Sequence, residues 1–346
     1  MAADQILNRL KLRDLRILLA VTQTGSMAKA ATQLATSQPA VSRAVADMEA
    51  TLGVTLLERS SQGVEPTPCG RALIRRGIAV FDELRQGVKE IEFIADPTVG
   101  EVRVGGTSTI VTGIIAAVID RMSRQYPRVS FRVVAAAPPA LARHLREREL
   151  DMIIWRAFAP VRDESFESEV LFEDRMVVVA GPDNPWSRRR RVDLAQLANE
   201  IWTLPEPEHP IGAALAEAFR AKGVEGPRAS VMTSAGDLRD TLLATGRFLT
   251  IVPESLLQFP VKLPSFKVLP VDLPTTRART SIHTLRNRAL SPVAQLFIEG
   301  VRELARPLAR LGAASRRGAM SAQLSTSAQK RTLRAGETGR AANRAG

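Results

Sequence analysis

The chain has 346 residues, 45% of them hydrophobic, so it is long enough for two domains with buried cores, and wholesale disorder is excluded. The longest apolar stretch, residues 110–119, is far shorter than the roughly 20 residues that a membrane-spanning helix needs. A single cysteine, Cys69, excludes an intramolecular disulfide framework and a metal site made of cysteines alone. The N-terminus has no basic segment followed by an apolar core, so we expect a cytoplasmic protein with no membrane partner.

The net charge of +12 is distributed unevenly along the chain. Residues 312–346 contain seven basic residues and one acidic residue, whereas residues 1–96 contain 12 Lys and Arg against 11 Asp and Glu. The overall charge is therefore no argument for nucleic-acid binding by the N-terminal part. Residues 312–346 also lack apolar periodicity, which predicts a disordered basic tail. Such a tail either adds nonspecific affinity for DNA or is a neutral extension.

The pattern of apolar residues in residues 1–66 is typical of helices and predicts a first domain of short helices. A first helix with an apolar face ends at Gly25, and Ser26 is a suitable N-cap for the second. Ser37 followed by Pro39 predicts the start of a third helix, which ends at Gly53. Two helices joined by a tight turn are typical of a helix-turn-helix.

The outward face of the third helix carries side chains that suit base recognition. Gln38 can pair with adenine, Arg43 with guanine, and Ser42 with a base edge or a phosphate. Residues 56–59 and 63–66 predict a two-stranded wing with a phosphate contact on its first strand. The alternative is an ordinary solvated face, but the caps, turn and wing favour DNA contact. The candidate DNA-binding residues are Ser26, Ser37, Gln38, Pro39, Ser42, Arg43 and Arg59.

Residues 67–96 predict one long amphipathic helix, which ends before Pro97. Its apolar residues recur at steps of three and four, and basic residues flank them. This stripe either packs on its own domain or pairs two chains, and we favour a dimer seam. The stripe consists of Ile74, Ile78, Phe81, Leu84, Val88 and Ile91.

Residues 97–311 alternate strand-like and helical runs, which predicts a parallel α/β sheet. The order of these runs indicates two lobes, with lobe 1 at about 97–161 and 265–311 and lobe 2 at about 162–264. We expect a small ligand to bind between the lobes, because strand carboxyl ends and helix N-termini converge there.

Two groups of residues in this region are candidates for ligand binding. Thr107, Ser108 and Thr109 lie where a strand meets a helix N-terminus, which suits a carboxylate or another anion, although plain helix capping explains them equally well. Trp155 and Arg156 follow a buried strand and can supply an aromatic wall and a cation. Two other roles are open for the Arg156 side chain: an exposed surface charge, or a salt bridge between the lobes.

The sequence contains no recognisable catalytic constellation. His144, His209 and His283 are widely scattered, and no two of them have metal-binding helical spacing. The pair Gly105–Gly106 alone is too weak to indicate a phosphate-binding loop. We therefore expect no enzyme, no metal and no cofactor. Four successive arginines at 188–191 predict a solvated loop, with an anion or phosphate contact as the alternative.

Residues 12–70 resemble the N-terminal domain of LysR-type transcriptional regulators. A weaker resemblance extends from Gly100 to about Leu308. The sequence departs from the family pattern at two places. Ala35 stands in the turn where the family often has Gly, His or Asn, and residues 246–249 replace a glycine-rich turn. The matching stretches are Leu15 to Ala20, Gly25-Ser26, Ala30-Ala31, Ser37 to Arg43, Leu52-Gly53, Leu56 to Arg59, and Pro66-Thr67 with Gly70.

The resemblance implies an α/β fold class with a winged helix-turn-helix, a long linker helix and a two-lobed effector-binding domain like that of periplasmic binding proteins. It also implies that the linker helix forms a homodimer, that dimers assemble into tetramers, and that Thr203, Thr233 and Ser234 line the effector site. We predict a regulator that reads double-stranded promoter DNA and responds to a small effector, such as an anionic aromatic or sugar-derived acid. RNA polymerase is a further candidate partner. The alternatives are a small-molecule binding protein whose helical domain no longer reads DNA and, with less support, an enzyme built on the lobes.

Overall fold

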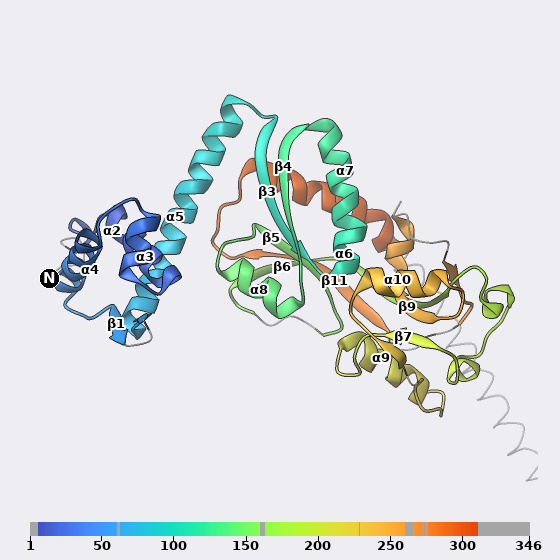
Figure 1. Cartoon of the computed structure of the whole chain (residues 1–346). Coiled ribbons are helices and arrows are strands. Elements are labelled where there is room, and N and C mark those ends of the chain that lie inside the picture. Colours follow the sequence, from blue (N-terminus) through green and yellow to red (C-terminus); the bar gives the residue numbers. More distant parts are fainter. Residues whose placement is uncertain are drawn as a thin grey trace, which may run out of the picture. The chain divides into compact units, whose positions relative to one another are not determined.

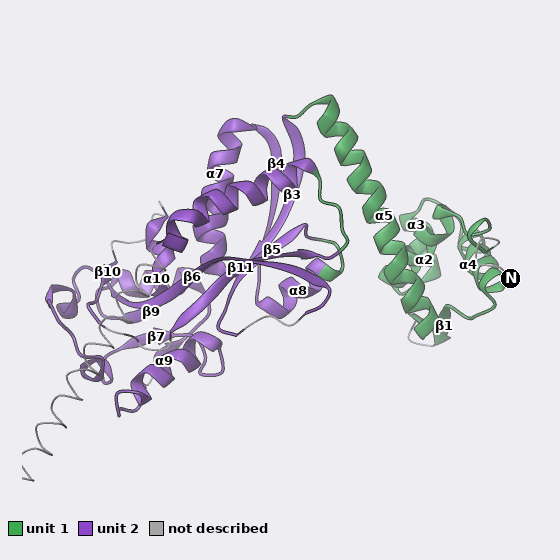
Figure 2. Cartoon of the chain, turned by 180° about the vertical axis from the view of Figure 1, so that it is seen from behind, with its two compact units in different colours: residues 1–97, 146–149, 287–291 green, residues 98–145, 150–286, 292–346 purple. Residues whose placement is uncertain are grey.

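The chain forms two compact units in a computed structural model, and each is described by itself (Figures 1 and 2). Unit 1 contains residues 1–97, 146–149 and 287–291, and unit 2 contains the rest. The predicted tail and the predicted lobe boundaries near 161 and 264 lie outside the described residues. Among the described residues, none of the helices combines the length and apolar character needed to cross a membrane. The structure describes residues 6–60, 63–159, 163–227, 229–259, 266–271, 273 and 276–310.

Unit 1 begins with three helices, α2 (Leu12–Thr24), α3 (Met27–Gln33) and α4 (Gln38–Leu52). Local signals set their ends: Gly25 and Gly53 have positive φ angles of 65° and 69°, which favour glycine. The hydroxyls of Ser26 and Ser37 accept hydrogen bonds from the N–H groups of the first turns of α3 and α4. The helices share one hydrophobic core, whose most buried members include Leu18, Val21, Ala30, Val41, Val45 and Met48.

A two-stranded antiparallel wing and one long helix complete the main part of unit 1. The wing is formed by β1 (Leu57–Ser60) and β2 (Gly63–Pro66), and the helix is α5 (Pro68–Ala95). Thr67 caps α5 by accepting a hydrogen bond from the Gly70 N–H at 3.0 Å. A Cβ atom on Gly70 would lie 2.0 Å from the Leu56 carbonyl oxygen, so only glycine permits α5 to start this close to the wing.

Unit 2 is built on one mixed sheet with the strand order β4-β3-β5-β11-β6-β9-β7-β8, to which β10 is added beside β6. Buried aliphatic side chains dominate its central strands, as expected for a sheet covered on both faces. The strands are β3 (Val99–Gly106), β4 (Arg128–Ala135), β5 (Met152–Ala157), β6 (Phe166–Ala180), β7 (Trp202–Leu204), β8 (Ala229–Met232), β9 (Leu249–Pro253), β10 (Lys267–Val268) and β11 (Arg277–Leu285).

The predicted parallel arrangement is correct for only part of this sheet. β3 runs parallel to β4 and β5, and β7 runs parallel to β8 and β9. In contrast, β11 is antiparallel to β5 and β6, and β6 is antiparallel to β9. Residues 166–175 of β6 pair with β11, and residues 176–180 pair with β9. A single strand thus belongs to both halves of the sheet, and the predicted parallel sheet is in fact mixed, because β6 and β11 run antiparallel between two parallel parts.

Helices connect the strands and supply much of the remaining core. The strand β3 leads into one continuous helical segment made of α6 (Ser108–Ile110), the π-helical turn η1 (Val111–Ile115) and α7 (Ala116–Gln125). The other helices are α8 (Pro138–Arg146), η2 (Pro185–Arg188), η3 (Leu194–Leu197), α9 (Pro210–Arg220), α10 (Gly236–Ala244), η4 (Glu254–Gln258) and residues 292–310.

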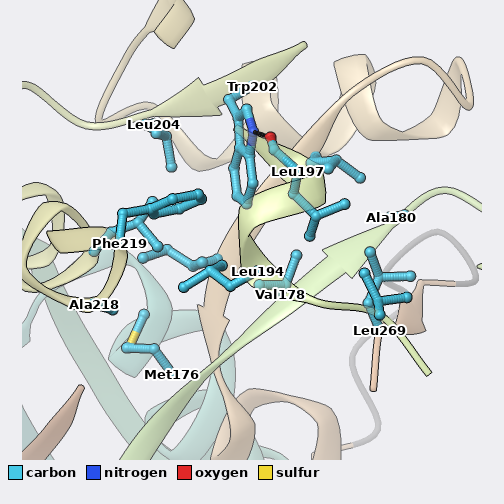
Figure 3. Close-up of a cluster of buried hydrophobic side chains, with 14 residues drawn as sticks. Met176, Val178, Ala180, Leu194, Leu197, Trp202, Leu204, Ala218, Phe219 and Leu269 are labelled. Carbon is cyan, nitrogen blue, oxygen red and sulfur yellow. Dashed lines mark hydrogen bonds between the residues drawn. The ribbon is translucent and has the colours of Figure 1, made fainter. Parts of the chain in front are cut away.

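The core of the second half of unit 2 surrounds Trp202 (Figure 3). The indole N–H of Trp202 donates a hydrogen bond to the Leu197 carbonyl oxygen at 2.8 Å, so this large side chain is buried without an unsatisfied donor. Phe219 meets the indole edge-on at a centroid distance of 6.2 Å. These contacts hold α9 and η3 against the sheet.

Candidate DNA interface and effector site

The N-terminal half of α4 presents an exposed polar face. Gln38, Pro39 and Arg43 are exposed, and Ser42 is half-buried beside them. Residues three and four positions apart share one side of a helix, so these four side chains form one surface. Among the described residues, neither Gln38 nor Arg43 has a side-chain hydrogen bond or an ion pair. Both side chains are therefore available to an external ligand such as a base edge.

The other predicted DNA contacts lie around this surface in different environments. Ser37 is exposed at the N-cap of α4, and Ser26 is half-buried at the N-cap of α3. Each hydroxyl already accepts a capping hydrogen bond, and it retains its O–H donor for a phosphate oxygen. Arg59 is exposed on β1, opposite Val64 in the wing.

The turn before α4 has an unusual backbone conformation. Ala35 has a φ angle of +49°, in the left-handed region that a residue with a Cβ rarely adopts. The alanine at this turn position therefore adopts a strained backbone conformation, which costs about 1–2 kcal/mol of conformational free energy. The Thr36 N–H donates to the Ala31 carbonyl oxygen at 2.9 Å, and this hydrogen bond helps to hold the turn.

Two contacts that position the wing are not evident in the sequence. The Glu49 carboxylate on α4 accepts hydrogen bonds from the N–H groups of Leu56 and Leu57 at 2.7 and 3.2 Å. The Val64 N–H donates to the Gly25 carbonyl oxygen at 3.0 Å, which ties the second wing strand to the end of α2. A charged residue on a helix predicts a solvated side chain, so only the folded chain identifies Glu49 as a support for the wing.

The predicted dimerisation stripe divides into two parts along α5. Ile74 packs on the core of the first three helices, and Ile78 and Phe81 are half-buried. Leu84, Val88 and Ile91, in contrast, are 50%, 54% and 68% exposed. Val80 and Ile94, which the sequence pattern left out, are also exposed and continue this row. The first part of the helix therefore packs on its own domain, and the second part presents an uncovered apolar surface.

A buried carboxylate on α5 is the centre of an ion cluster within unit 1. Asp82 is 1% exposed, and its two oxygens accept hydrogen bonds from Nε and Nη2 of Arg288 at 2.7 and 2.9 Å. Arg148 donates from Nη1 to the same carboxylate at 2.9 Å and to Glu83 at 3.1 Å. Burial by itself raises the pKa of Asp82, but the two guanidinium groups outweigh burial and lower that pKa below its usual value.

Both arginines of this cluster are presented by unusual backbone. Arg148 has a φ angle of 58°, and Asn287, which precedes Arg288, has a φ angle of 55°. Non-glycine residues in the left-handed region persist where the surrounding structure holds them. Here the Asp82 carboxylate contacts both arginines and so holds residues 146–149 and 287–291 in place.

In unit 2, two groups of predicted effector residues come together. Ser108 begins α6 and is exposed, and Gly236 begins α10. A Cβ atom on Gly236 would lie only 3.1 Å from Ser108 Oγ, so the two helix starts are close neighbours. Thr233 and Ser234, which directly precede α10, therefore belong to the same region as Thr107 to Thr109 (Figure 1).

Several polar groups of this region have unused hydrogen-bonding capacity. Among the described residues, no bond to the N–H of Ser108 or Thr109 is present, as expected for the first turn of a helix. Thr203, the middle residue of β7, is buried, and its hydroxyl has no hydrogen-bond partner in the described part of the chain. Helix N-termini carry partial positive charge, so this combination suits an anionic or strongly polar ligand.

Arg156 forms a buried ion pair. Its Nη2 lies 2.9 Å from an oxygen of Asp174, and the two side chains are 6% and 3% exposed. Asp174 also accepts hydrogen bonds from the backbone N–H and the hydroxyl of Ser255, and Arg156 Nη1 donates to Thr109 Oγ1 at 3.3 Å. The charge of Arg156 is thus already compensated, and the side chain links β5, α6, β6 and η4. Asp174 and Ser255 were not singled out in the sequence, although an acidic residue next to the apolar run 176–180 was a usable signal.

Trp155 lies on the opposite side of β5 from Arg156. It packs with Leu141, Leu145 and Phe166 in the core beside α8, because successive residues of a strand point to opposite faces. Trp155 and Arg156 therefore do not flank one ligand.

His283 packs against Trp155 and is almost completely buried. The two ring centroids are 4.6 Å apart, and His283 Nδ1 lies 2.7 Å from Ser168 Oγ. Burial lowers the pKa of His283 to about 4 from its usual 6.5. The imidazole is therefore neutral at pH 7.

We expect His283 to make the protein less stable at mildly acidic pH. Between pH 6.5 and about 4 the unfolded chain binds a proton at this site and the folded chain does not, so stability falls as the pH falls through this range. Between pH 7.5 and pH 5 the loss is about 2 kcal/mol. Unfolding of the full chain at both pH values measures it: His283→Leu should lose most of this pH dependence, whereas Leu285→Ala in the same core should keep it. Equal pH dependence in all three proteins would contradict the prediction.

Together, the two units define a class of protein: a winged helix-turn-helix with an exposed polar face, joined in one chain to a two-part α/β domain suited to a small polar ligand. Comparison with known families agrees. The profile of the bacterial regulatory helix-turn-helix proteins of the lysR family matches residues 12–71, and the profile of the LysR substrate binding domain matches residues 95–306. The chain belongs to the LysR family of transcriptional regulators.

Individual relatives are similar over most of their length. The transcriptional regulator GbpR of Azospirillum brasilense is 28% identical over 85% of this chain and 86% of its own, and the dual regulator GltC of Bacillus subtilis is 26% identical over 84% and 96%. A full-length variant of OxyR from Pseudomonas aeruginosa has the same fold, with a TM-score of 0.60 at 22% identity over 87% of this chain and 97% of its own.

These findings confirm the predicted fold class and function. The protein is a DNA-binding transcriptional regulator with an effector-binding domain, and its relatives are regulators rather than enzymes.

Proposed function

We propose that the exposed face of α4 reads the operator, with Gln38, Ser42 and Arg43 at base edges. Ser26, Ser37 and Pro39 approach the backbone from the helix starts, and Arg59 contacts phosphate from the wing. The observation that carries this assignment is the absence of intramolecular partners for Gln38 and Arg43 among the described residues. Exposed groups held on a rigid, capped helix need little reorganisation when DNA binds.

Binding to the protein's own upstream DNA tests this function. The full-length protein is titrated onto the upstream fragment and onto a scrambled fragment of equal length over a salt series. We expect a preference for the upstream fragment that persists at moderate salt, because base contacts do not depend on counterion release. Equal binding that disappears with salt would contradict sequence-specific reading.

Arg43→Ala should weaken operator binding and relax selectivity at one base pair. A bidentate contact to guanine contributes about 1–3 kcal/mol, which corresponds to a roughly fivefold to 150-fold loss of affinity. Arg76→Ala removes an exposed arginine of α5 and is the matched control. If Arg43→Ala and Arg76→Ala bind all single-base operator variants alike, Arg43 does not read a base.

We further propose that the exposed second part of α5 pairs with the same helix of another copy, so that Leu84, Val88 and Ile91 form a homodimer seam. An uncovered apolar row at helical spacing is destabilising in water and suits such a seam. A two-fold dimer should prefer an operator with dyad symmetry, and pairs of dimers should form tetramers through unit 2. Sedimentation of the full chain measures this assembly.

For the effector we propose a small carboxylate held at the start of α6, with Thr107, Ser108 and Thr109 on one side and Thr233 and Ser234 on the other. Within the described part of the chain, the N–H groups of Ser108 and Thr109 and the buried Thr203 hydroxyl have no hydrogen-bond partner, which supports an anionic ligand. Arg156 serves as a support rather than a free cation, because Asp174 already neutralises it. Benzoate and gluconate, with benzyl alcohol as the neutral control, are suitable probes of thermal stability and of operator binding.

The site of action and one partner follow from this function. A regulator of promoter DNA acts in the cytoplasm at the nucleoid, and RNA polymerase is the partner through which it changes transcription. Transcription reconstituted with purified polymerase tests this contact.

A further inference from the structure

Four successive arginines, Arg188 to Arg191, form an exposed loop in unit 2, which we call the arginine loop. Arg188 is the last residue of the short helix η2, and the other three arginines lie between η2 and η3. It is far in sequence from the helix-turn-helix, and it takes no part in the proposed effector site.

The arginine loop is braced at both ends. Asn184 caps η2 by accepting a hydrogen bond from the Trp186 N–H at 3.0 Å, and its amide donates to the Gly246 carbonyl oxygen at 3.0 Å. Asp193 caps η3 by accepting from the Ala195 N–H at 3.1 Å, and Gln196 completes a capping box. Trp186 packs on the adjacent core. The four arginines therefore stand on a fixed backbone.

The charges of this loop are not compensated locally. Among the described residues, none of the four arginines has an ion pair or a side-chain hydrogen bond. Other exposed arginines of unit 2 do have carboxylate partners: Arg121 with Glu303, Arg220 with Glu217, and Arg302 with Glu169. The nearest carboxylate in sequence, Asp193, is occupied as a helix cap. The loop thus keeps an excess positive charge on four adjacent exposed side chains.

We propose that the arginine loop binds phosphate groups of the DNA backbone and gives the effector-binding part of the chain a DNA contact of its own. Guanidinium groups bind phosphate oxygens in a bidentate manner, and they do so without reading sequence. The contact forms only after the helix-turn-helix has bound the same DNA, because the local concentration of phosphate is then high. This inference rests on the protein being a DNA-binding regulator.

The expected size of the effect follows from the backbone. Arg188 ends η2 and Arg189 has an extended backbone, so the four side chains do not share one direction, and we expect about two of them to contact phosphate at once. Each phosphate contact contributes about 0.9 to the slope of the logarithm of affinity against the logarithm of salt concentration. Two contacts therefore weaken binding about an additional tenfold when salt rises from about 50 to about 200 mM.

The test uses the full-length protein and its upstream DNA, with affinity measured across the salt series. For the variant R188Q/R189Q/R190Q/R191Q, the slope of the logarithm of affinity against the logarithm of salt concentration should be smaller in magnitude by about 2. The matched control R121Q/R175Q/R220Q/R302Q removes the same number of positive charges from ion pairs in unit 2, and its slope should stay within about 0.5 of the wild-type slope. Both variants should keep the preference for the upstream fragment over the scrambled one, because the helix-turn-helix is unchanged.

Two results would overturn the proposal. Equal slopes for the arginine-loop variant and the wild type would exclude a phosphate contact. If that variant also lost polymerase-dependent transcription, the loop would instead bind an acidic protein surface. Equal losses of slope in both variants would mean that only net charge matters. A wild-type protein without preference for the upstream fragment would instead contradict sequence-specific reading, so the two failures are distinguishable.

Discussion

Asp82→Ala should be among the most destabilising single substitutions in unit 1, with a loss of about 3–5 kcal/mol in the free energy of unfolding. Asp82 now neutralises Arg288, whose side chain is completely buried, and it also holds Arg148. Removing the carboxylate leaves the Arg288 charge in the protein interior without this compensation. The amides of the neighbouring turns of α5 should then exchange with solvent faster by two orders of magnitude or more, which hydrogen-exchange mass spectrometry measures.

Asp120→Ala is the matched control for this measurement. Asp120 forms an exposed pair with Arg124 four residues later on α7, so its loss should change stability by less than about 0.5 kcal/mol. Asp82→Asn keeps the shape of the side chain and should fall between the two. If Asp82→Ala and Asp120→Ala have the same small effect, the buried cluster does not stabilise unit 1.

Asp174→Ala should destabilise unit 2 by a similar amount, about 3–5 kcal/mol. Asp174 compensates the buried charge of Arg156 and accepts the backbone N–H of Ser255. Burial lowers the pKa of Arg156, and Asp174 partly offsets this effect, so without the carboxylate the buried guanidinium is less stable still. Thermal unfolding of the full chain followed by circular dichroism measures the loss.

Small carboxylates provide a second measurement on this variant. Acetate or formate can occupy the space that the Asp174 side chain leaves, and either should restore part of the lost stability of Asp174→Ala but add nothing to the wild type. Glu254→Ala, which removes the exposed partner of Arg175, is the control and should lose less than about 1 kcal/mol. A loss in Asp174→Ala no larger than in Glu254→Ala would contradict the assigned role of the ion pair.

The N-terminal domain was predictable from the sequence because its structure depends on short-range signals. Ser26 and Ser37 cap helices within three residues of themselves, and Gly25 and Gly53 end helices at positive φ angles. The apolar positions that form the core recur at helical spacing. The exposed face of α4 follows directly, since it is the side opposite this core.

The candidate ligand-binding region was predicted less completely. The start of α6 was located correctly, because a strand followed by hydroxyl residues is a local pattern. The role of Arg156 was left open between a ligand contact, a surface charge and a salt bridge, and its partner Asp174 lies 18 residues away on another strand. Trp155 was grouped with Arg156 because they are adjacent in sequence, whereas the pleat of β5 separates them.

Short-range patterns were enough to predict the class of protein, the helix ends, the wing and the exposed face of α4, because each depends on neighbours within a few positions. The direction of β6 and β11, the exposed half of the α5 stripe and the partners of the buried charges became evident only in the folded chain. Asp82 meets Arg288 across 206 residues of chain, and no local pattern encodes such a pair. The free-energy cost of a buried charge depends on the groups around it in space, and the fold alone brings those groups together.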